Sequence, residues 1–163
     1  MSYPTKSGLN AAQRIAARRR IKRAAYLWLD HAPEIHYSQD AVLRWEGITK
    51  HLRSYRGEYA RHADCSSFAT YVHWDGTLRW KPKDYVNGQS WKAGYTGTQE
   101  DCGRRVTGRT MVGDLVQYGG HVAVVVRGAR TLHDTLVISH GSEAGPFLLR
   151  ADYRPVAQVR RYL

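Results

Sequence analysis

The chain of 163 residues lacks several features that would place it in a common class. It has two cysteines, too few for the disulfide-rich scaffold of a small secreted domain. No apolar run approaches the roughly 18 residues that span a bilayer. The apolar stretch 24–29 is also too short and too far along the chain for a secretory signal peptide. We therefore expect neither a transmembrane segment nor a signal peptide.

Acidic residues are absent from positions 1–23, which are rich in Lys and Arg. The whole chain carries 25 Lys and Arg against 14 Asp and Glu, a net charge of +11. A basic segment of this kind can bind along a polyanion. It can equally be the solvated face of a helix, because Ile15, Ile21, Ala25 and Trp28 recur at helical spacing and can dock on a core. The two interpretations are compatible, and both remain open.

Metal and nucleotide motifs are also missing. The sequence contains no His-Glu-x-x-His, no Cys-x-x-Cys and no glycine-rich phosphate loop. We therefore predict no metal site and no cofactor. Cys102 stands in the glycine-rich segment Asp101–Gly103, and we expect it on the surface.

The pattern of apolar residues predicts helices first and a sheet afterwards, an α+β arrangement. Helices are expected over 10–28 with Asn10 as N-cap, over 40–56, and from Asp64 to Gly76. Residues 75–110 are expected to form a long, partly ordered loop region. Short β-branched runs predict antiparallel strands at 115–118, 121–126, 135–139 and 157–160. We divide the chain into a basic tail and helix (1–34) and a second part (35–163), which together form one globular unit.

Cys65 is the first residue with potential chemistry, because Asp64 can cap a helix that begins at the cysteine. Free N–H groups and the positive end of the helix dipole there favour thiolate, the nucleophilic form of cysteine. A buried structural thiol is the alternative interpretation, since free cysteine is among the most buried residue types.

Two histidines supply a possible base and its partner. His121 opens an apolar strand after Gly119-Gly120, a suitable place for a general base. His140 ends the next strand, and we expect it to bond the distal nitrogen of His121 and fix its tautomer. Ser139 is expected to point to the opposite face, and Glu143 is the second choice for the orienting role. Without further context, each histidine could instead be structural.

Three ordered motifs together resemble the NlpC/P60 family of papain-like cysteine peptidases. They are Asp64-Cys65-Ser66-Ser67, then Gly113-Asp114-Leu115-Val116 leading to His121-Val122-Ala123, and then Ile138-Ser139-His140-Gly141-Ser142. The segments 35–39, 44–48, 94–98 and 141–146 resemble endolysins of phages that infect actinobacteria. The resemblance covers residues 35–163. It implies a papain-like fold in which the nucleophile begins a helix packed on a C-terminal antiparallel sheet.

The resemblance also implies roles at matching positions. Cys65 corresponds to the nucleophile, His121 to the base and His140 to the orienting residue, with the Cys65 N–H as an oxyanion donor. The family's Tyr-x-Trp-Gly-Gly motif is missing, and Tyr37 or Tyr59 is considered in place of its tyrosine. The candidates for substrate binding or the oxyanion site are Tyr37, Trp45, Asp64, Ser66, Tyr95 and Glu143.

The implied activity is a cell-wall endopeptidase that cleaves stem peptides, commonly between D-glutamate and diaminopimelate, through an acyl-enzyme on Cys65. Its partner would be bacterial peptidoglycan, with anionic wall polymers held by the basic N-terminal helix. We expect a monomer that stays in the host cytoplasm until it is released to the wall at lysis. An amidase or acyltransferase on the same scaffold is the second hypothesis. A basic nucleic-acid-binding module is the third, although we expect no nucleic acid partner.

Overall fold

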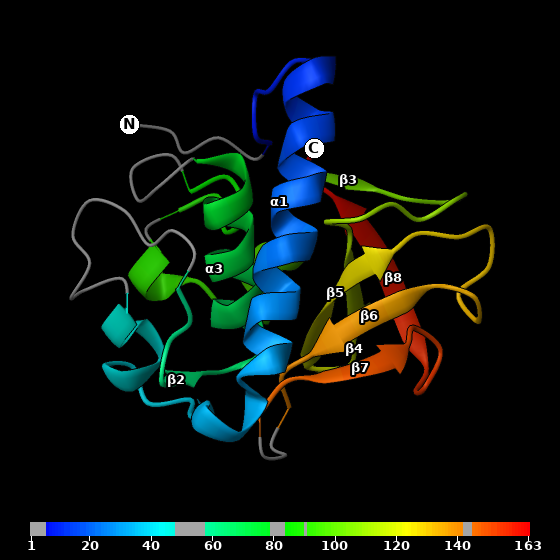
Figure 1. The fold of residues 1–163 in the computed structure, drawn as a ribbon. Helices are drawn as coiled ribbons and strands as arrows, with labels where there is room; N and C mark the ends of the chain where they lie inside the picture. Colours follow the sequence, from blue (N-terminus) through cyan, green and yellow to red (C-terminus); the bar gives the residue numbers. More distant parts are fainter. Residues whose placement is uncertain (1–5, 48–57, 79–83, 90, 142–144) are drawn as a thin grey trace.

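Two long helices lie side by side and cover one face of an antiparallel sheet in this computed structural model (Figure 1), which describes residues 6–47, 58–78, 84–89, 91–141 and 145–163. The helices are α1 (Ala11–Asp30), α3 (Cys65–Thr77) and the short α4 (Thr96–Glu100). Single 3₁₀ turns, η1 (Ala32–Glu34), η2 (Leu43–Trp45) and η4 (Trp91–Ala93), lie between them. Among the described residues, no helix is both long and apolar enough to cross a bilayer.

The main sheet has the strand order β3-β8-β4-β5-β6-β7, and every neighbouring pair is antiparallel. Its strands are β3 (Arg104–Arg105), β4 (Leu115–Tyr118), β5 (His121–Arg127), β6 (Leu136–Ser139), β7 (Phe147–Arg150) and β8 (Val156–Arg161). A separate parallel pair joins β1 (His36–Tyr37) to β2 (His62–Ala63). The predicted α+β class is confirmed at this level.

Helix α1 begins where the sequence predicts, because Asn10 forms a capping box with Gln13. Ile21, Ala25 and Trp28 are buried in the core, as their spacing predicts. The prediction for Ile15 is wrong: its side chain is 57% exposed, because it lies beyond the part of α1 that packs on the body of the protein.

Helix α3 is the centre of the molecule, and nearly all of its residues are buried. Asp64 is its N-cap, and the Asp64 carboxylate accepts a hydrogen bond of 2.8 Å from the Ser67 N–H. At its other end the helix approaches α1 closely: a Cβ on Gly76 would come within 2.2 Å of Ile21 Cγ1. The glycine therefore allows the two helices to pack tightly at this end of α3.

The four predicted strands are present as β4, β5, β6 and β8, whereas β1, β2, β3 and β7 were not predicted. Strand β7 escapes detection because Phe147 and Leu148 are both substantially exposed, so it lacks a simple inward-facing apolar pattern. Of the helix expected over 40–56, the structure has the 3₁₀ turn η2 followed by helical residues 46–47, and residues 48–57 lie outside the described residues. The expected loop region 75–110 contains η4, α4 and β3.

The two faces of the sheet contribute to different apolar clusters. Val122, Val124 and Ile138 face the helices and join the cluster that contains Cys65. Ala123 and Val137 face the other way, into a smaller cluster with Tyr118. This alternation decides which side chains at the start of β5 can meet those at the end of β6.

Candidate active site

Cys65 is the first residue of α3, and its side chain is directed at the start of β5. The Thr96 hydroxyl lies 3.9 Å from Sγ, and the backbone N–H groups of Val122 and Ser66 favour the thiolate and so act to lower its pKa. Only 5% of Cys65 is exposed. Burial, and then the charge of Asp64, raise the pKa of the thiol. These two effects oppose the helix dipole, so a nearby base would have to remove the proton.

A buried arginine holds the start of α3 in place. Arg44 Nε lies 2.9 Å from Asp64 Oδ2, and Arg44 Nη2 donates to Asp64 Oδ1 at 3.1 Å. Nη2 also donates to Ser66 Oγ at 2.6 Å, and Nη1 to the carbonyl of Gly94 at 2.8 Å. The guanidinium thus joins η2, the N-cap of α3 and the segment that leads into α4. It fixes the residues on both sides of Cys65.

A second network fixes α4, which carries Thr96. Gln99 Nε2 donates to the Ser66 carbonyl at 2.9 Å, and the Thr98 hydroxyl donates to Asn87 Oδ1 at 3.1 Å. Asn87 Nδ2 in turn donates to Thr70 Oγ1 of α3 at 3.1 Å. Because Gln99, Asn87 and Thr70 are all buried, these bonds are shielded from water. They attach α4 to the first turns of α3.

His121 begins β5 and is held by a hydroxyl of the neighbouring strand. Its Nε2 lies 2.7 Å from Ser139 Oγ, and Ser139 Oγ lies 3.3 Å from the Tyr153 hydroxyl. The imidazole also stacks on the Tyr118 ring, with centroids 5.7 Å apart. If Nε2–H donates to Ser139, then Nδ1 carries the lone pair and is the nitrogen that can accept a proton.

The expectation that Ser139 faces away from His121 is wrong. In the register of β5 and β6, Ala123 is opposite Ser139, so His121, two residues before Ala123, lies on the same face as Ser139. His140 points to the helix side, where it is fully buried and its ring meets those of Tyr37 and Phe68 edge-on, at 5.7 and 6.3 Å. The hydroxyl of Ser139 therefore makes the contact that we expected from His140.

Cys65 and His121 line two adjacent grooves. The groove at Cys65 has a volume of about 510 Å³, and the groove at His121 about 430 Å³. Gly120 lines both. Tyr37, in the His121 groove, accepts a hydrogen bond at 2.9 Å from Gln39, which lines the other. The two grooves therefore meet at Gly120, where the thiol comes from the helix side of the sheet and the imidazole from the side that carries Ser139.

The remaining predicted residues are placed as follows. Tyr37 lines the cleft, and burial followed by the nearby Cys65 raises the pKa of its phenol. Tyr95 is 59% exposed at the rim of the Cys65 groove. Trp45 is buried against Tyr71 and has no place in the cleft lining, so it supports Arg44, whose guanidinium lies 4.5 Å from its ring centroid.

Three other expectations can be followed in the structure. Tyr59 is away from the cleft lining, stacked on His31 and donating to Glu34. Cys102 is buried rather than on the surface, because it packs in the main core, and burial raises the pKa of its thiol to about 11. Glu143 lies outside the described residues. Within the described ranges, no cluster of three or more His, Cys, Asp or Glu could hold a metal ion.

Sequence reasoning gave no role to Arg44, Thr96 or Ser139. Nothing local marks Arg44 as the partner of Asp64, since 20 residues separate them in the sequence. Ser139 could have been found by testing a register in which it is opposite Ala123. Thr96 would have required the position of α4.

Comparison with known proteins assigns neither a family nor a function to the chain. No protein-family model matches the chain, and no curated protein sequence matches it significantly. The candidate site therefore depends on its own geometry and on the motif resemblance described above.

Proposed function

We propose that this protein is a cysteine endopeptidase that hydrolyses stem peptides of bacterial peptidoglycan, released to the cell wall when the host cell lyses. Cys65 is the nucleophile, His121 the general base and Ser139 the residue that orients His121. The observation that carries the proposal is the position of Cys65: it begins a buried helix and lines a groove that meets the His121 groove at Gly120. The bond between D-glutamate and diaminopimelate is the substrate that the motif resemblance favours.

The reaction begins with proton transfer from Cys65 to Nδ1 of His121. The thiolate attacks the carbonyl carbon of the peptide, and the C–S bond forms as the carbonyl π electrons move to oxygen. The Cys65 backbone N–H, at the start of α3 where it has no helical partner, can donate to this oxyanion. The tetrahedral intermediate collapses, the C–N bond breaks, and the imidazolium protonates the leaving amine. Water, activated by His121, then hydrolyses the thioester and restores the thiol.

Ser139 gives His121 one tautomer and one orientation. The Ser139 oxygen accepts a hydrogen bond from Nε2–H of His121, and the Ser139 hydroxyl can donate its own proton to the Tyr153 hydroxyl. Each group in this series therefore donates to the next. A serine hydroxyl is neutral and stabilises an imidazolium less than a carboxylate does. We therefore expect Ser139 to act mainly through orientation.

The test is mass spectrometry of the soluble products released from diaminopimelate-type peptidoglycan. Wild type should release shortened stem peptides, while Cys65→Ala and His121→Ala should release none. Cys102→Ala is the matched control, because it removes the other thiol, which is away from the cleft, and it should keep the wild-type products.

Three results would contradict the proposal. Intact stem peptides freed from the glycan would identify an amidase on the same site. Activity that survives Cys65→Ala, or the absence of products from wild type on walls of several peptide chemistries, would exclude a Cys65-dependent peptidase.

A further inference from the structure

The strongest feature that the proposed reaction does not use is a basic groove on the side of α1, away from the cleft lining. It consists of two pockets that share Arg18 and Met111. The first, of about 580 Å³, lies between the start of α1, β3 and the end of β8. The second, of about 270 Å³, lies between α1 and residues 109–112. Together they are lined by Lys6, Arg14, Arg18, Arg19, Lys22, Arg104, Arg109 and Arg161.

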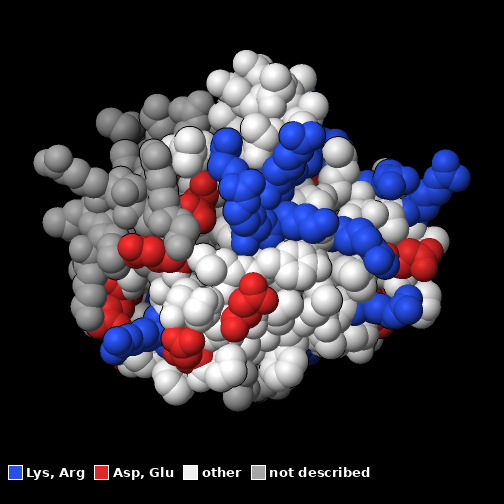
Figure 2. Space-filling model, in the orientation of Figure 1, with Lys and Arg blue, Asp and Glu red and all other residues white. Residues whose placement is uncertain are grey.

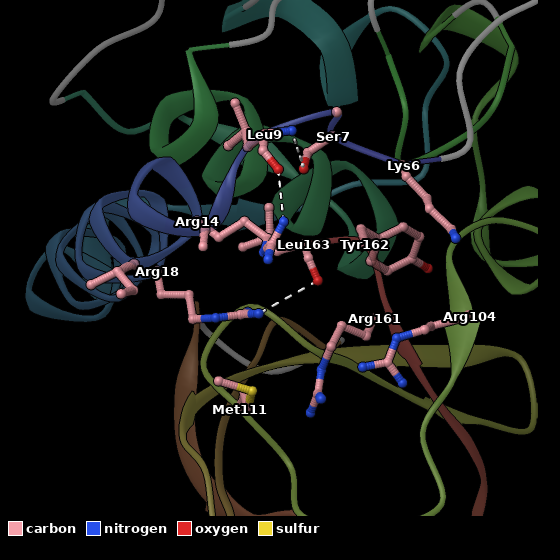
Figure 3. A pocket seen from close by; sticks show the side chains of 13 residues that line it. Lys6, Ser7, Leu9, Arg14, Arg18, Arg104, Met111, Arg161, Tyr162 and Leu163 are labelled. Carbon is pink, nitrogen blue, oxygen red and sulfur yellow. Dashed lines mark hydrogen bonds between the residues drawn. The ribbon is translucent and has the colours of Figure 1, made fainter.

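The positive charges of this basic groove come from separate parts of the chain. Figure 2 shows Lys and Arg side chains gathered in a band over α1 and the region beside it. Figure 3 shows Arg14 and Arg18 from α1 with Arg104 from β3 and Arg161 from β8 around the first pocket. The fold therefore brings together cations from distant parts of the sequence, and a hydrogen bond from Arg18 to the Val112 carbonyl, 94 positions away, holds α1 against this region.

One of these cations is paired with a buried carboxylate behind the groove, and the described lining itself supplies no acidic side chain. None of the described residues that line the two pockets is Asp or Glu. Arg161 is bound to the buried Asp114, with two contacts of 2.7 Å. Arg18, by contrast, donates to main-chain oxygens of Val112 and Leu163. Burial and the positive charges of Arg161, Arg14 and Arg104 lower its pKa, although Asp114 acts in the opposite direction. An anion placed among these groups would relieve their mutual repulsion.

The shape and chemistry of the groove select the kind of anion. Guanidinium groups, which predominate here, match phosphate oxygens in bidentate geometry. Pockets of this volume can admit a thin single chain. The single aromatic residue among the described lining, Tyr162, is 2% exposed, so the groove presents no ring on which a base could stack.

We propose that this groove binds a flexible single-chain phosphodiester polymer without bases, of the polyol-phosphate type. The polymer would enter at Arg104 and Lys6, pass Arg18 and Met111, and leave at Lys22 and Arg109. Two anion-binding pockets in series make the groove a track for successive phosphates. Binding depends on several weak, salt-sensitive contacts, as is usual for flexible polyanions.

The experiment measures binding of fluorescent poly(glycerol phosphate) by anisotropy at several salt concentrations. The test variant is Lys22→Gln/Arg104→Gln/Arg109→Gln, three exposed residues of the groove. The matched control is Arg61→Gln/Lys92→Gln/Arg130→Gln, three exposed residues outside it with the same loss of charge. We expect the groove variant to lose about tenfold in affinity at low salt, and the control to stay within about twofold. The salt slope of the groove variant should fall by about two.

Three outcomes would overturn the proposal: equal losses in both variants, tighter binding of single-stranded DNA with the same number of phosphates, or no binding of the polymer by wild type. Equal thermal stability of the two variants confirms that both are folded. Because the purified polymer contains no peptide, the result does not depend on whether Cys65 is catalytic. Failure of the peptidase proposal would therefore leave this one to be judged on its own.

Discussion

The buried pair Arg44–Asp64 offers a sharp test of how the candidate site is held together. We consider Arg44→Met, which keeps an unbranched side chain of similar length but removes the guanidinium. Both partners are about nine-tenths buried, and the carboxylate of Asp64 would remain without its cation. Breaking a buried pair from one side costs about 3–5 kcal/mol of unfolding free energy. We expect a loss in that range.

The double variant Arg44→Met/Asp64→Asn separates the charge effect from lost packing. Asparagine is also a good N-cap, so it keeps the bond to the Ser67 N–H that starts α3. It leaves no buried charge, and we expect the double variant to be more stable than Arg44→Met by about 2 kcal/mol or more. Urea unfolding of wild type, both single variants and the double variant measures the coupling energy. If the double variant is as unstable as the sum of the single losses, the two residues are not coupled and the reasoning fails.

The same variants report on the thiol. The negative charge of Asp64 raises the pKa of Cys65. Removing this charge in Asp64→Asn should lower that pKa, increase the thiolate fraction at any pH below it, and speed alkylation by iodoacetamide. The measurement is made in a Cys102→Ala background, so that Cys65 supplies the signal. An unchanged alkylation rate would show that Asp64 does not influence the thiol.

Two further predictions concern histidines. Ser139→Ala should lower kcat/KM about five- to tenfold, the equivalent of one hydrogen bond, while Ser139→Thr should retain most of the activity; equal activity in both variants would exclude orientation of His121 by this hydroxyl. Burial lowers the pKa of His73 to about 4 from 6.5, because the ring is enclosed with Tyr85 and the Gly113 carbonyl as partners. The neutral ring therefore contributes stability that is complete above pH 6.5 and falls by about 3 kcal/mol as the pH drops to 4. Urea unfolding should show this loss in wild type and a smaller pH dependence in His73→Gln; identical pH dependence would refute it.

Local rules predicted the elements that carry the candidate nucleophile. A capping residue followed by an uninterrupted helix is visible within a few positions, so Asp64 and Cys65 were placed correctly. The strands that contain His121 and Ser139 follow from short β-branched runs. What local rules could not provide was Arg44, because its partner is determined by tertiary packing.

The choice between Ser139 and His140 shows how a shift of one residue changes a functional prediction. Side chains alternate along a strand, so neighbouring residues face opposite sides of the sheet. Pairing Ala123 with Ser139 puts the serine beside His121 and sends His140 to the helix side, against Tyr37 and Phe68. A register shifted by one residue would exchange these roles, and both residues are polar enough to fit either sequence pattern. The identity of the orienting group is therefore a property of strand pairing, which residues 121–141 alone do not encode.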